Sequence, residues 1–191
     1  MWDDIRKALE ARGPDGYSSG KDDDTDGARS AVIVPLFQAQ SGLGILFIER
    51  SDQVKLHRGQ MGFPGGMMEE KDGEDPMRTA LRETEEEIGL FPEMVTILGH
   101  LRTRRTYTTG ITVTPFVASV PFPYTYSPDP VEIKEIHPGL IETVKDTKSG
   151  QENPFGLPGP VYTIRDKPVW GLTAAIFTEL LEVLEPIQTK R

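Results

Sequence analysis

The segment from Phe63 to Leu90 constrains this chain more than any other, because it joins a glycine pair to a helix whose two ends are both marked. Asp75 can cap free backbone N–H groups, and Pro76 suits the first helical position. Gly89 supplies the left-handed residue at which many helices end. The apolar residues between these limits follow helical spacing: Met77, Ala80, Leu81, Thr84 and Ile88. The segment is therefore predicted to form a helix that packs one side on a core.

The remaining surface of this helix is rich in carboxylates. Glu83 and Glu87 lie one turn apart, and Glu86 lies close to both. Neighbouring carboxylates raise one another's pKa, and a hard divalent cation such as Mg²⁺ relieves the repulsion. The Gly65-Gly66 turn allows a ligand to approach closely, and Arg82 can orient a carboxylate by charge-assisted hydrogen bonds. A solvated, salt-bridged helix face is the alternative, but the agreement of turn, caps, stripe and acids favours a metal site.

Residues 82–90, RETEEEIGL, resemble the second half of the Nudix box, and Gly66 with Glu74 resembles its first half. The family pattern is a Gly, five residues, a Glu, seven residues, then Arg-Glu. Glu74 to Arg82 keeps this spacing, whereas two extra residues stand between Gly66 and Glu74. Thr84 occupies a position where the pattern has an aliphatic residue.

This resemblance implies an α/β protein with the Nudix fold, in which a mixed β-sheet lies between α-helices. It also implies a metal-dependent hydrolase that splits the diphosphate of a small nucleotide. The implied ligands of Mg²⁺ or Mn²⁺ are Glu83, Glu86, Glu87 and the Gly66 carbonyl. The implied catalytic residues are Glu83 as the first choice of base, Glu86 as the second, and Arg82.

A second resemblance concerns the substrate. Residues 46–51, LFIERS, followed by Lys55, Gly59 and residues 63–66, FPGG, are similar to the signature of the coenzyme A pyrophosphatase branch, with Lys55 where that branch has Arg. Residues 30–36, 113–117 and 169–174 look like further segments of that branch, so the likeness spans about 29–184. It implies cleavage of coenzyme A or a derivative into 4′-phosphopantetheine and adenosine 3′,5′-bisphosphate.

A substrate with several phosphates needs a local group of cations on a chain whose net charge is −9. The residues predicted to contact the substrate are Arg50, Lys55, Arg58, Phe63 and Arg102. Arg104, Arg105 and His57 are further basic candidates, and Phe63 and Trp170 are aromatic residues that either stack on adenine or fill the core. Glu132, Glu135 and His137 follow a proline-rich loop from which an acid can reach the metal site.

Two other functions remain open at this point. One is the same chemistry on ADP-ribose or another nucleoside diphosphate derivative. The other is a Nudix-like domain that binds a nucleotide as a sensor without turning it over. The intact carboxylate set argues against a sensor, since a binding module has no evident need for it.

Composition narrows the class of protein. The 191 residues suit one compact domain, and 30 acidic against 21 basic residues argue against a broad nucleic-acid-binding face. The absence of cysteine excludes disulfides, thiolate catalysis and Cys-ligated zinc. No run is apolar enough to span a membrane, and neither a secretory signal nor a peroxisomal C-terminal address is recognisable, so a cytoplasmic protein is predicted. The sequence leaves the assembly open between a monomer and a homodimer.

The order of elements predicts two regions. Residues 1–29 are expected to form an amphipathic helix over 2–12 and a flexible acidic linker over 13–27. Residues 30–187 are expected to form the Nudix domain. Its predicted strands cover 30–38, 43–50, 94–104, 111–120, 131–136, 161–165 and the surroundings of Val169, with irregular loops over 121–130 and 154–160. Its predicted helices cover 75–89, 138–145 and 174–184.

Overall fold

The computed structural model describes residues 1–12, 27–106, 109–149, 156 and 158–188. Its helices are α1 (Trp2–Glu10), α2 (Pro76–Ile88), α3 (Ile141–Lys145) and α4 (Gly171–Gln188), with short 3₁₀ helices η1 (Glu70–Asp72) and η2 (Pro92–Met94). Its strands are β1 (Arg29–Ala39), β2 (Gly42–Arg50), β3 (Met61–Gly62), β4 (Gly65–Met67), β5 (Thr96–His100), β6 (Arg104–Arg105), β7 (Thr112–Ser119), β8 (Ile133–Leu140), β9 (Tyr162–Ile164) and β10 (Lys167–Val169).

The main sheet is mixed and is centred on β1. This strand pairs in parallel with β7 and antiparallel with both β2 and β4. On one side β7 pairs antiparallel with β5 and β6, and on the other β2 pairs antiparallel with β3 and β8. The β9–β10 hairpin forms a separate two-stranded sheet. Because β1 pairs with β4, the glycine pair of β4 lies directly beside the central strand.

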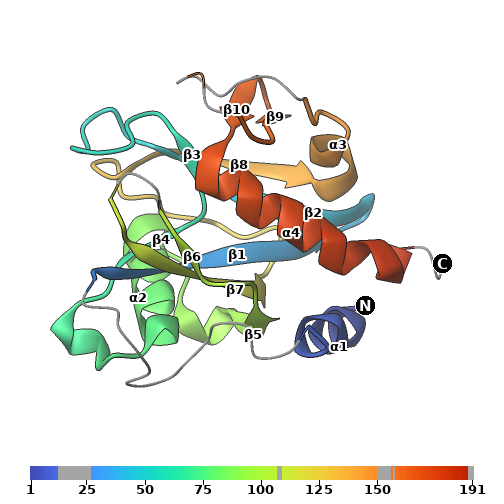
Figure 1. Ribbon diagram of the computed structural model, residues 1–191, viewed down its shortest axis with the longest axis horizontal. Coiled ribbons are helices and arrows are strands. Elements are labelled where there is room, and N and C mark those ends of the chain that lie inside the picture. Colours follow the sequence, from blue (N-terminus) through green and yellow to red (C-terminus); the bar gives the residue numbers. More distant parts are fainter. Residues whose placement is uncertain (13–26, 107–108, 150–155, 157, 189–191) are drawn as a thin grey trace.

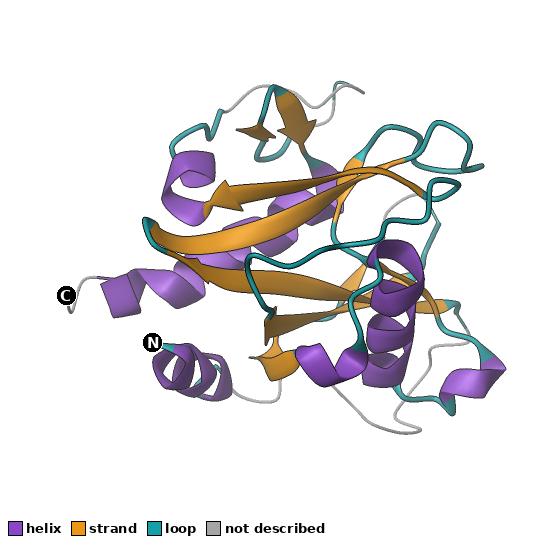
Figure 2. Cartoon of the chain, turned by 180° about the vertical axis from the view of Figure 1, so that it is seen from behind, coloured by secondary structure: helices purple, strands orange, loops and turns teal. Residues whose placement is uncertain are grey.

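Helices cover both faces of the sheet. Helix α2 lies on one face, whereas α4 crosses the opposite face with α1 near its C-terminal end (Figures 1 and 2). The core on the α4 face includes Phe47, Tyr162 and Phe177, whose rings meet edge to face. The core on the α2 face includes Ile33, Ala80 and Phe116. The predicted mixed sheet between helices is confirmed, and no described helix has the length and apolar character needed to cross a membrane.

Most predicted elements are present, and three differ. The strand expected over 94–104 is divided into η2, β5 and β6. The strand expected over 131–136 begins at Ile133 and continues to Leu140, so the helix expected from Pro138 begins only at Ile141. Pro138 lies opposite Leu46 in the β2–β8 ladder and therefore belongs to a strand. The linker predicted over 13–27 lies almost wholly outside the described residues, as do residues 154, 155 and 157 of the loop predicted over 154–160.

Candidate active site

Helix α2 begins and ends where its sequence signals lie. The Asp75 side chain accepts a hydrogen bond of 2.9 Å from the Met77 N–H, and Gly89 has a φ of 66°. The segment between β7 and β8 holds the other end of the helix. Backbone N–H groups of Ser127 and Asp129 donate to the carbonyls of Ile88 and Glu87, both at 2.9 Å. The carboxylate-bearing turns of α2 are therefore fixed by capping contacts at both ends.

The two glycines of β4 make room for different neighbours. A Cβ atom on Gly65 would lie 2.2 Å from the Ala31 carbonyl oxygen, and the φ of Gly65 is 147°. A Cβ atom on Gly66 would instead lie 2.4 Å from the carboxyl carbon of Glu83. Gly65 thus lets β4 approach β1, whereas Gly66 lets the Glu83 carboxylate lie directly against the β4 backbone. The sequence prediction that the glycine pair permits close approach is consistent with this geometry.

Arg82 forms hydrogen bonds with several carboxylates on and beside the acidic face of α2. Its Nη1 donates to Glu83 Oε1 at 2.7 Å and to Glu86 Oε2 at 2.9 Å. Its Nε and Nη2 donate to the two oxygens of Asp72 at 2.8 and 2.9 Å. One guanidinium therefore orients two of the predicted metal ligands while a third carboxylate fixes the guanidinium itself.

Asp72 was missed by the sequence reasoning, which assigned the box acid to Glu74. Asp72 is 3% exposed, and it also accepts hydrogen bonds from Thr79 Oγ1 and the Glu69 N–H. Glu74 is exposed and has a left-handed φ of 65°. Five residues separate Gly66 from Asp72, so an Asp occupies the position of the box Glu and the two extra residues follow it. Counting from Gly66 rather than back from Arg82 would have found it.

Glu87 differs from its neighbours because it is almost completely buried, with 1% of its side chain exposed. Its Oε2 accepts the Gly65 N–H at 2.9 Å, and its Oε1 accepts Arg50 Nη1 at 3.1 Å. Burial raises the pKa of Glu87 to about 7, although both of these donors oppose the shift. The nearby charges of Glu83 and Glu132 raise it further.

The pKa of Glu83 is raised by the same kinds of cause as that of Glu87. Burial raises the pKa of Glu83, Arg82 counteracts part of that shift, and the charges of Glu86 and Glu132 add to it. An oxygen-only donor set, in which burial raises the pKa of Glu83 and of Glu87, fits a hard divalent cation such as Mg²⁺ or Mn²⁺. In the described part of the chain, however, the three helix carboxylates do not bring one oxygen each within 4.8 Å of one another. Glu83 and Glu86 turn to Arg82, and Glu87 turns to Arg50 and Gly65.

The group that does meet this distance consists of Glu49, Glu135 and His137. Glu49 Oε1 already lies 3.0 Å from the ammonium groups of both Lys134 and Lys167. Burial raises the pKa of Glu49, but hydrogen bonds from the two lysines outweigh burial and leave it below its ordinary value. These contacts indicate an ion-paired network that joins β2, β8 and β10. Glu135 belongs to this network, whereas Glu132 acts electrostatically on Glu83 and Glu87.

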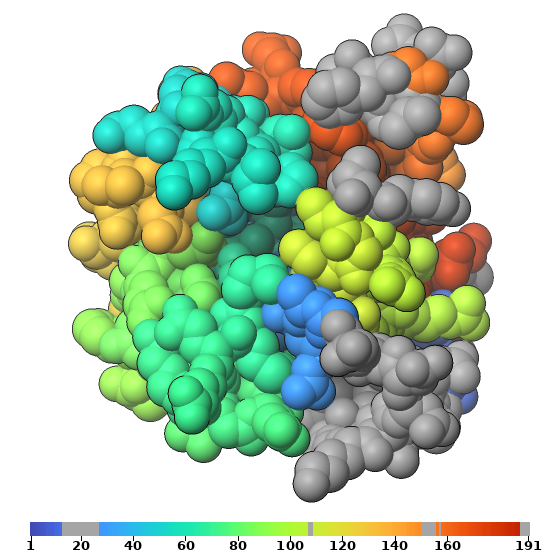
Figure 3. Space-filling model, turned by 60° about the vertical axis from the view of Figure 1, so that its left-hand side comes forward, coloured from blue at the N-terminus to red at the C-terminus, as the bar shows by residue number. Residues whose placement is uncertain are grey.

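The basic residues predicted to contact the substrate occupy two kinds of position. Lys55, His57 and Arg58 are exposed on the loop over 51–60, where Arg58 Nε donates to the Val54 carbonyl at 2.7 Å. In Figure 3 this cyan loop stands beside a hollow whose other side is formed by the green segment that contains α2. Arg50 lies at the base of the loop and contacts Glu87. The structure thus brings the loop and the acidic helix to the same region of the surface.

Two of the predicted substrate contacts need correction or qualification. Phe63 is 5% exposed, and its ring stacks on Phe47 with the centroids 5.0 Å apart, so it is a core residue rather than a platform for adenine. The backbone N–H of Arg102 donates to Glu179 of α4 at 3.1 Å. Arg104 pairs with the same carboxylate at 2.7 Å, which makes it a link to α4. Sequence spacing could not indicate these partners, because they come from distant segments.

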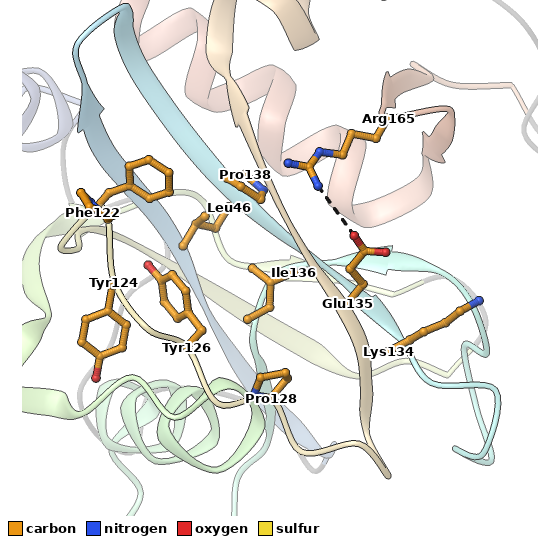
Figure 4. Close-up of a pocket in the computed structure, with 11 residues that line it drawn as sticks. Leu46, Phe122, Tyr124, Tyr126, Pro128, Lys134, Glu135, Ile136, Pro138 and Arg165 are labelled. Carbon is orange, nitrogen blue, oxygen red and sulfur yellow. Dashed lines mark ion pairs between the residues drawn. The ribbon is translucent and has the colours of Figure 1, made fainter.

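A separate open cavity of about 430 Å³ lies along β8 and away from the helix carboxylates. Figure 4 shows Phe122, Tyr124 and Tyr126 on one side of it, with Glu135 and Arg165 paired on the other. None of the acidic residues of α2 lines this cavity. Its aromatic residues come from the loop that was predicted to be irregular.

Comparison with known proteins identifies the family. The model of the NUDIX domain matches residues 27–147, which include the whole of the glycine turn and α2. The chain belongs to the Nudix family. A mouse relative, peroxisomal coenzyme A diphosphatase NUDT7, is 33% identical over 131 residues, which are 64% of this chain and 55% of that protein. The uncharacterized Nudix hydrolase NudL of Escherichia coli K12 is 31% identical over 161 residues, which are 80% of each chain.

Solved structures agree with this assignment at the level of the fold. A Nudix hydrolase from Alicyclobacillus acidocaldarius matches with a TM-score of 0.58 and 16% identity, covering 88% of this chain and 98% of its own. RenU, a Nudix hydrolase from M. smegmatis, matches with a TM-score of 0.57 and 19% identity, covering 83% and 86%. The predictions of a Nudix fold and of a hydrolase acting on a phosphoric anhydride are confirmed at the level of family and enzyme class.

Proposed function

We propose that this protein is a metal-dependent Nudix pyrophosphohydrolase that cleaves coenzyme A or one of its derivatives. Water adds across the P–O–P bond, and the products are 4′-phosphopantetheine and adenosine 3′,5′-bisphosphate when the substrate is coenzyme A itself. The observation that carries this proposal is the packing of the Glu83 carboxylate over Gly66, within the reach of Arg82 and beside buried Glu87. Similarity to the mouse coenzyme A diphosphatase supports the choice of substrate, although the chain spans only 55% of that protein.

The acidic face of α2 supplies the residues for the metal. Glu83, Glu86, Glu87 and the Gly66 carbonyl would hold Mg²⁺ or Mn²⁺, whose charge neutralises phosphate oxygens and lowers the pKa of a bound water. Arg82 holds Glu83 and Glu86 in place through Nη1. Glu83 is the first choice of base, because its carboxylate lies partly buried against Gly66 and beside the other proposed metal ligands. Glu86 is exposed to solvent and is the second choice.

The exposed loop over 51–60 supplies the proposed contacts to the substrate. Lys55 and Arg58 can turn toward phosphate groups because both side chains extend into solvent on the same loop. Lys55 offers a single point charge where an arginine would offer a bidentate fork. Arg102 remains a proposed contact, and a small-molecule nucleotide remains the proposed partner.

A substrate panel with product identification tests the proposal. Coenzyme A, acetyl-coenzyme A and ADP-ribose are incubated with the protein and saturating Mg²⁺ or Mn²⁺, and products are identified by mass spectrometry. Preferred release of adenosine 3′,5′-bisphosphate is the expected result. Faster cleavage of ADP-ribose would make ADP-ribose the preferred substrate of the same hydrolysis reaction. Tight nucleotide binding without any product would indicate a sensor.

Glu83→Gln is the matched variant for the chemical step. It keeps the shape of the side chain but removes the charge and most of its basicity, so turnover should fall by about 10²- to 10⁴-fold while the fold is retained. Circular dichroism and thermal unfolding provide the control for folding. Near-normal turnover of this variant at saturating Mg²⁺ would exclude Glu83 as the base.

A further inference from the structure

Arg50 occupies a position that its place in the substrate signature does not explain. It is the last residue of β2, and its Nη1 lies 3.1 Å from Glu87 Oε1, although the two residues are 37 positions apart. The other oxygen of Glu87 accepts the Gly65 N–H at 2.9 Å. Both oxygens of this carboxylate are therefore held, one by β2 and one by β4. Contacts from two strands fix the side chain of a residue on α2.

The burial of Glu87 makes its cationic neighbour important. A carboxylate that is 1% exposed has lost nearly all its hydration, and an ionised carboxylate in that position needs hydrogen bonds and a compensating charge. Arg50 supplies that charge from a side chain that is itself 27% exposed. Two further carboxylates, Glu83 and Glu132, repel the charge on Glu87. Removal of the guanidinium would take away the positive charge that opposes these repulsions and leave the hydrogen bond from the Gly65 N–H in place.

The backbone of Arg50 also closes the loop that carries Lys55 and Arg58. Its N–H donates to the Gln60 carbonyl and its carbonyl accepts the Gly59 N–H, both at 3.0 Å. The next residue, Ser51, donates its N–H to the Glu132 carbonyl at 2.8 Å. The base of the loop is thus a short ladder of hydrogen bonds with Arg50 inside it. These backbone bonds fix the position from which the Arg50 side chain reaches Glu87.

We propose that Arg50 is a positioning residue that fixes the Glu87 carboxylate in the metal site, rather than a direct contact for the phosphates of the substrate. This inference rests on the proposed function, because it takes Glu87 to be a metal ligand. The proposal gives different roles to the two basic residues of the substrate signature. Arg50 acts through Glu87, and Lys55 acts on the substrate. A residue that orients a ligand typically changes metal affinity or activity by about 10- to 100-fold when it is removed.

Mn²⁺ binding and steady-state kinetics, measured on the same variants, test the proposal. Free Mn²⁺ is followed by electron paramagnetic resonance, and kcat and KM are measured at saturating Mn²⁺ with the substrate found in the panel. Arg50→Met should weaken Mn²⁺ binding by about tenfold and lower kcat by about 10- to 100-fold, with KM changed by less than about twofold. Arg50→Lys should recover part of both losses, because it retains the charge without the fork.

Lys55→Met and a double variant supply the contrasts. Lys55→Met should raise KM and leave Mn²⁺ affinity unchanged, since Lys55 is exposed on the loop. Arg50→Met combined with Glu87→Gln removes both charges, so it should fold even if the single Arg50→Met variant is unstable. Its Mn²⁺ affinity should match that of Glu87→Gln alone, because Arg50 has no further effect once Glu87 is neutral.

Two results would overturn the proposal. One is an Arg50→Met variant, or an Arg50→Lys variant if the former does not fold, that raises KM without weakening Mn²⁺ binding. The other is additivity of the Arg50 and Glu87 effects in the double variant. A wild-type protein that binds Mn²⁺ but cleaves no compound would remove only the proposed function, and the binding measurements would still decide the role of Arg50. A wild-type protein that binds no Mn²⁺ would overturn both.

Discussion

At the scale of single residues, Gly65 and Gly66 are adjacent but are required for different reasons. An added Cβ at Gly65 meets backbone atoms of Ala31 and Val32, which cannot move without disturbing the central strand. The three atoms nearest to an added Cβ at Gly66 belong to the end of the Glu83 side chain, which can rotate away. The first glycine therefore serves the fold, and the second serves the position of the proposed base.

Alanine at each position should separate these roles. Gly65→Ala should lower the free energy of unfolding by about 2–4 kcal/mol, since it combines a backbone clash with a strained φ. Gly66→Ala should lower it by less than about 1 kcal/mol but reduce turnover by about a hundredfold, because Glu83 is displaced. Urea denaturation and kcat measure the two effects. Equal loss of stability in both variants would contradict the distinction.

The raised pKa of Glu87 predicts that the free energy of unfolding depends on pH. In the metal-free protein its pKa is raised to about 7, so the unfolded chain releases this proton at a lower pH than the folded one. The stability that the protonated form provides is fully present below about pH 4.3 and is lost as pH rises through about 7, by on the order of 2–3 kcal/mol. Glu87→Gln lacks this loss, so its stability relative to wild type should rise between pH 5 and pH 8.5. Denaturation in the presence of EDTA at both values measures the difference, and a constant difference would contradict it.

At the scale of elements, contacts between η1 and α2 hold the acidic helix in its position. Asp72 at the end of η1 receives two hydrogen bonds from Arg82 and one from Thr79, both on α2. Hydrogen bonds from Arg82 hold the pKa of Asp72 well below its usual range, although burial acts in the opposite direction. This contact fixes the helix against the turn that follows the glycine pair, and it fixes Arg82 for its contacts with Glu83 and Glu86.

Asp72→Asn should weaken this contact without changing the shape of the side chain. A partly buried guanidinium loses its main ionic partner, so the free energy of unfolding should fall by about 2–4 kcal/mol at pH 7. Because the folded-state pKa of Asp72 is lowered, its stabilisation is present above about pH 4 and is lost as pH falls below that value. Glu74→Gln, at an exposed residue, is the control and should change stability by less than about 0.5 kcal/mol. If the control variant were the more damaging of the two, Glu74 would be the box acid after all.

Elements whose boundaries depend on local residues could be predicted from the sequence, and elements that depend on tertiary pairing could not. Helix α2 was predictable because Asp75, Pro76 and Gly89 act locally. The boundary between β8 and α3 was not, because Pro138 reads as a helix start and only its pairing with Leu46 of β2 keeps it in a strand. Strands β3 and β4 contain two and three residues and exist through pairing with β2 and β1. For the site, the acids of α2 were predictable from spacing, whereas the contact of Arg50 with Glu87 depends on tertiary structure.

At the scale of the whole molecule, the site and the N-terminal helix lie on opposite faces of one sheet. Ile5 and Leu9 of α1 are buried in the same core as α4, and Leu9 lies against Gly99 of β5. Arg12 beyond the helix lies 3.6 Å from Glu179, the carboxylate of α4 that also receives Arg104. These contacts join α1 to the layer that supports the sheet from behind the acidic helix. The predicted boundary near residue 29 can be tested through them.

Leu9→Ala should therefore destabilise the entire domain rather than release α1 alone. Loss of a buried leucine side chain costs about 2–5 kcal/mol when the cavity does not close, and hydrogen exchange should accelerate in β5 and α4 as well as in α1. The kcat of the folded variant should remain within about twofold of wild type, because the mutated face is remote from Glu83 and Glu87. Lys7→Ala, at an exposed residue of the same helix, is the matched control and should leave exchange unchanged. Faster exchange confined to α1 would instead support the predicted division of the chain into residues 1–29 and residues 30–187.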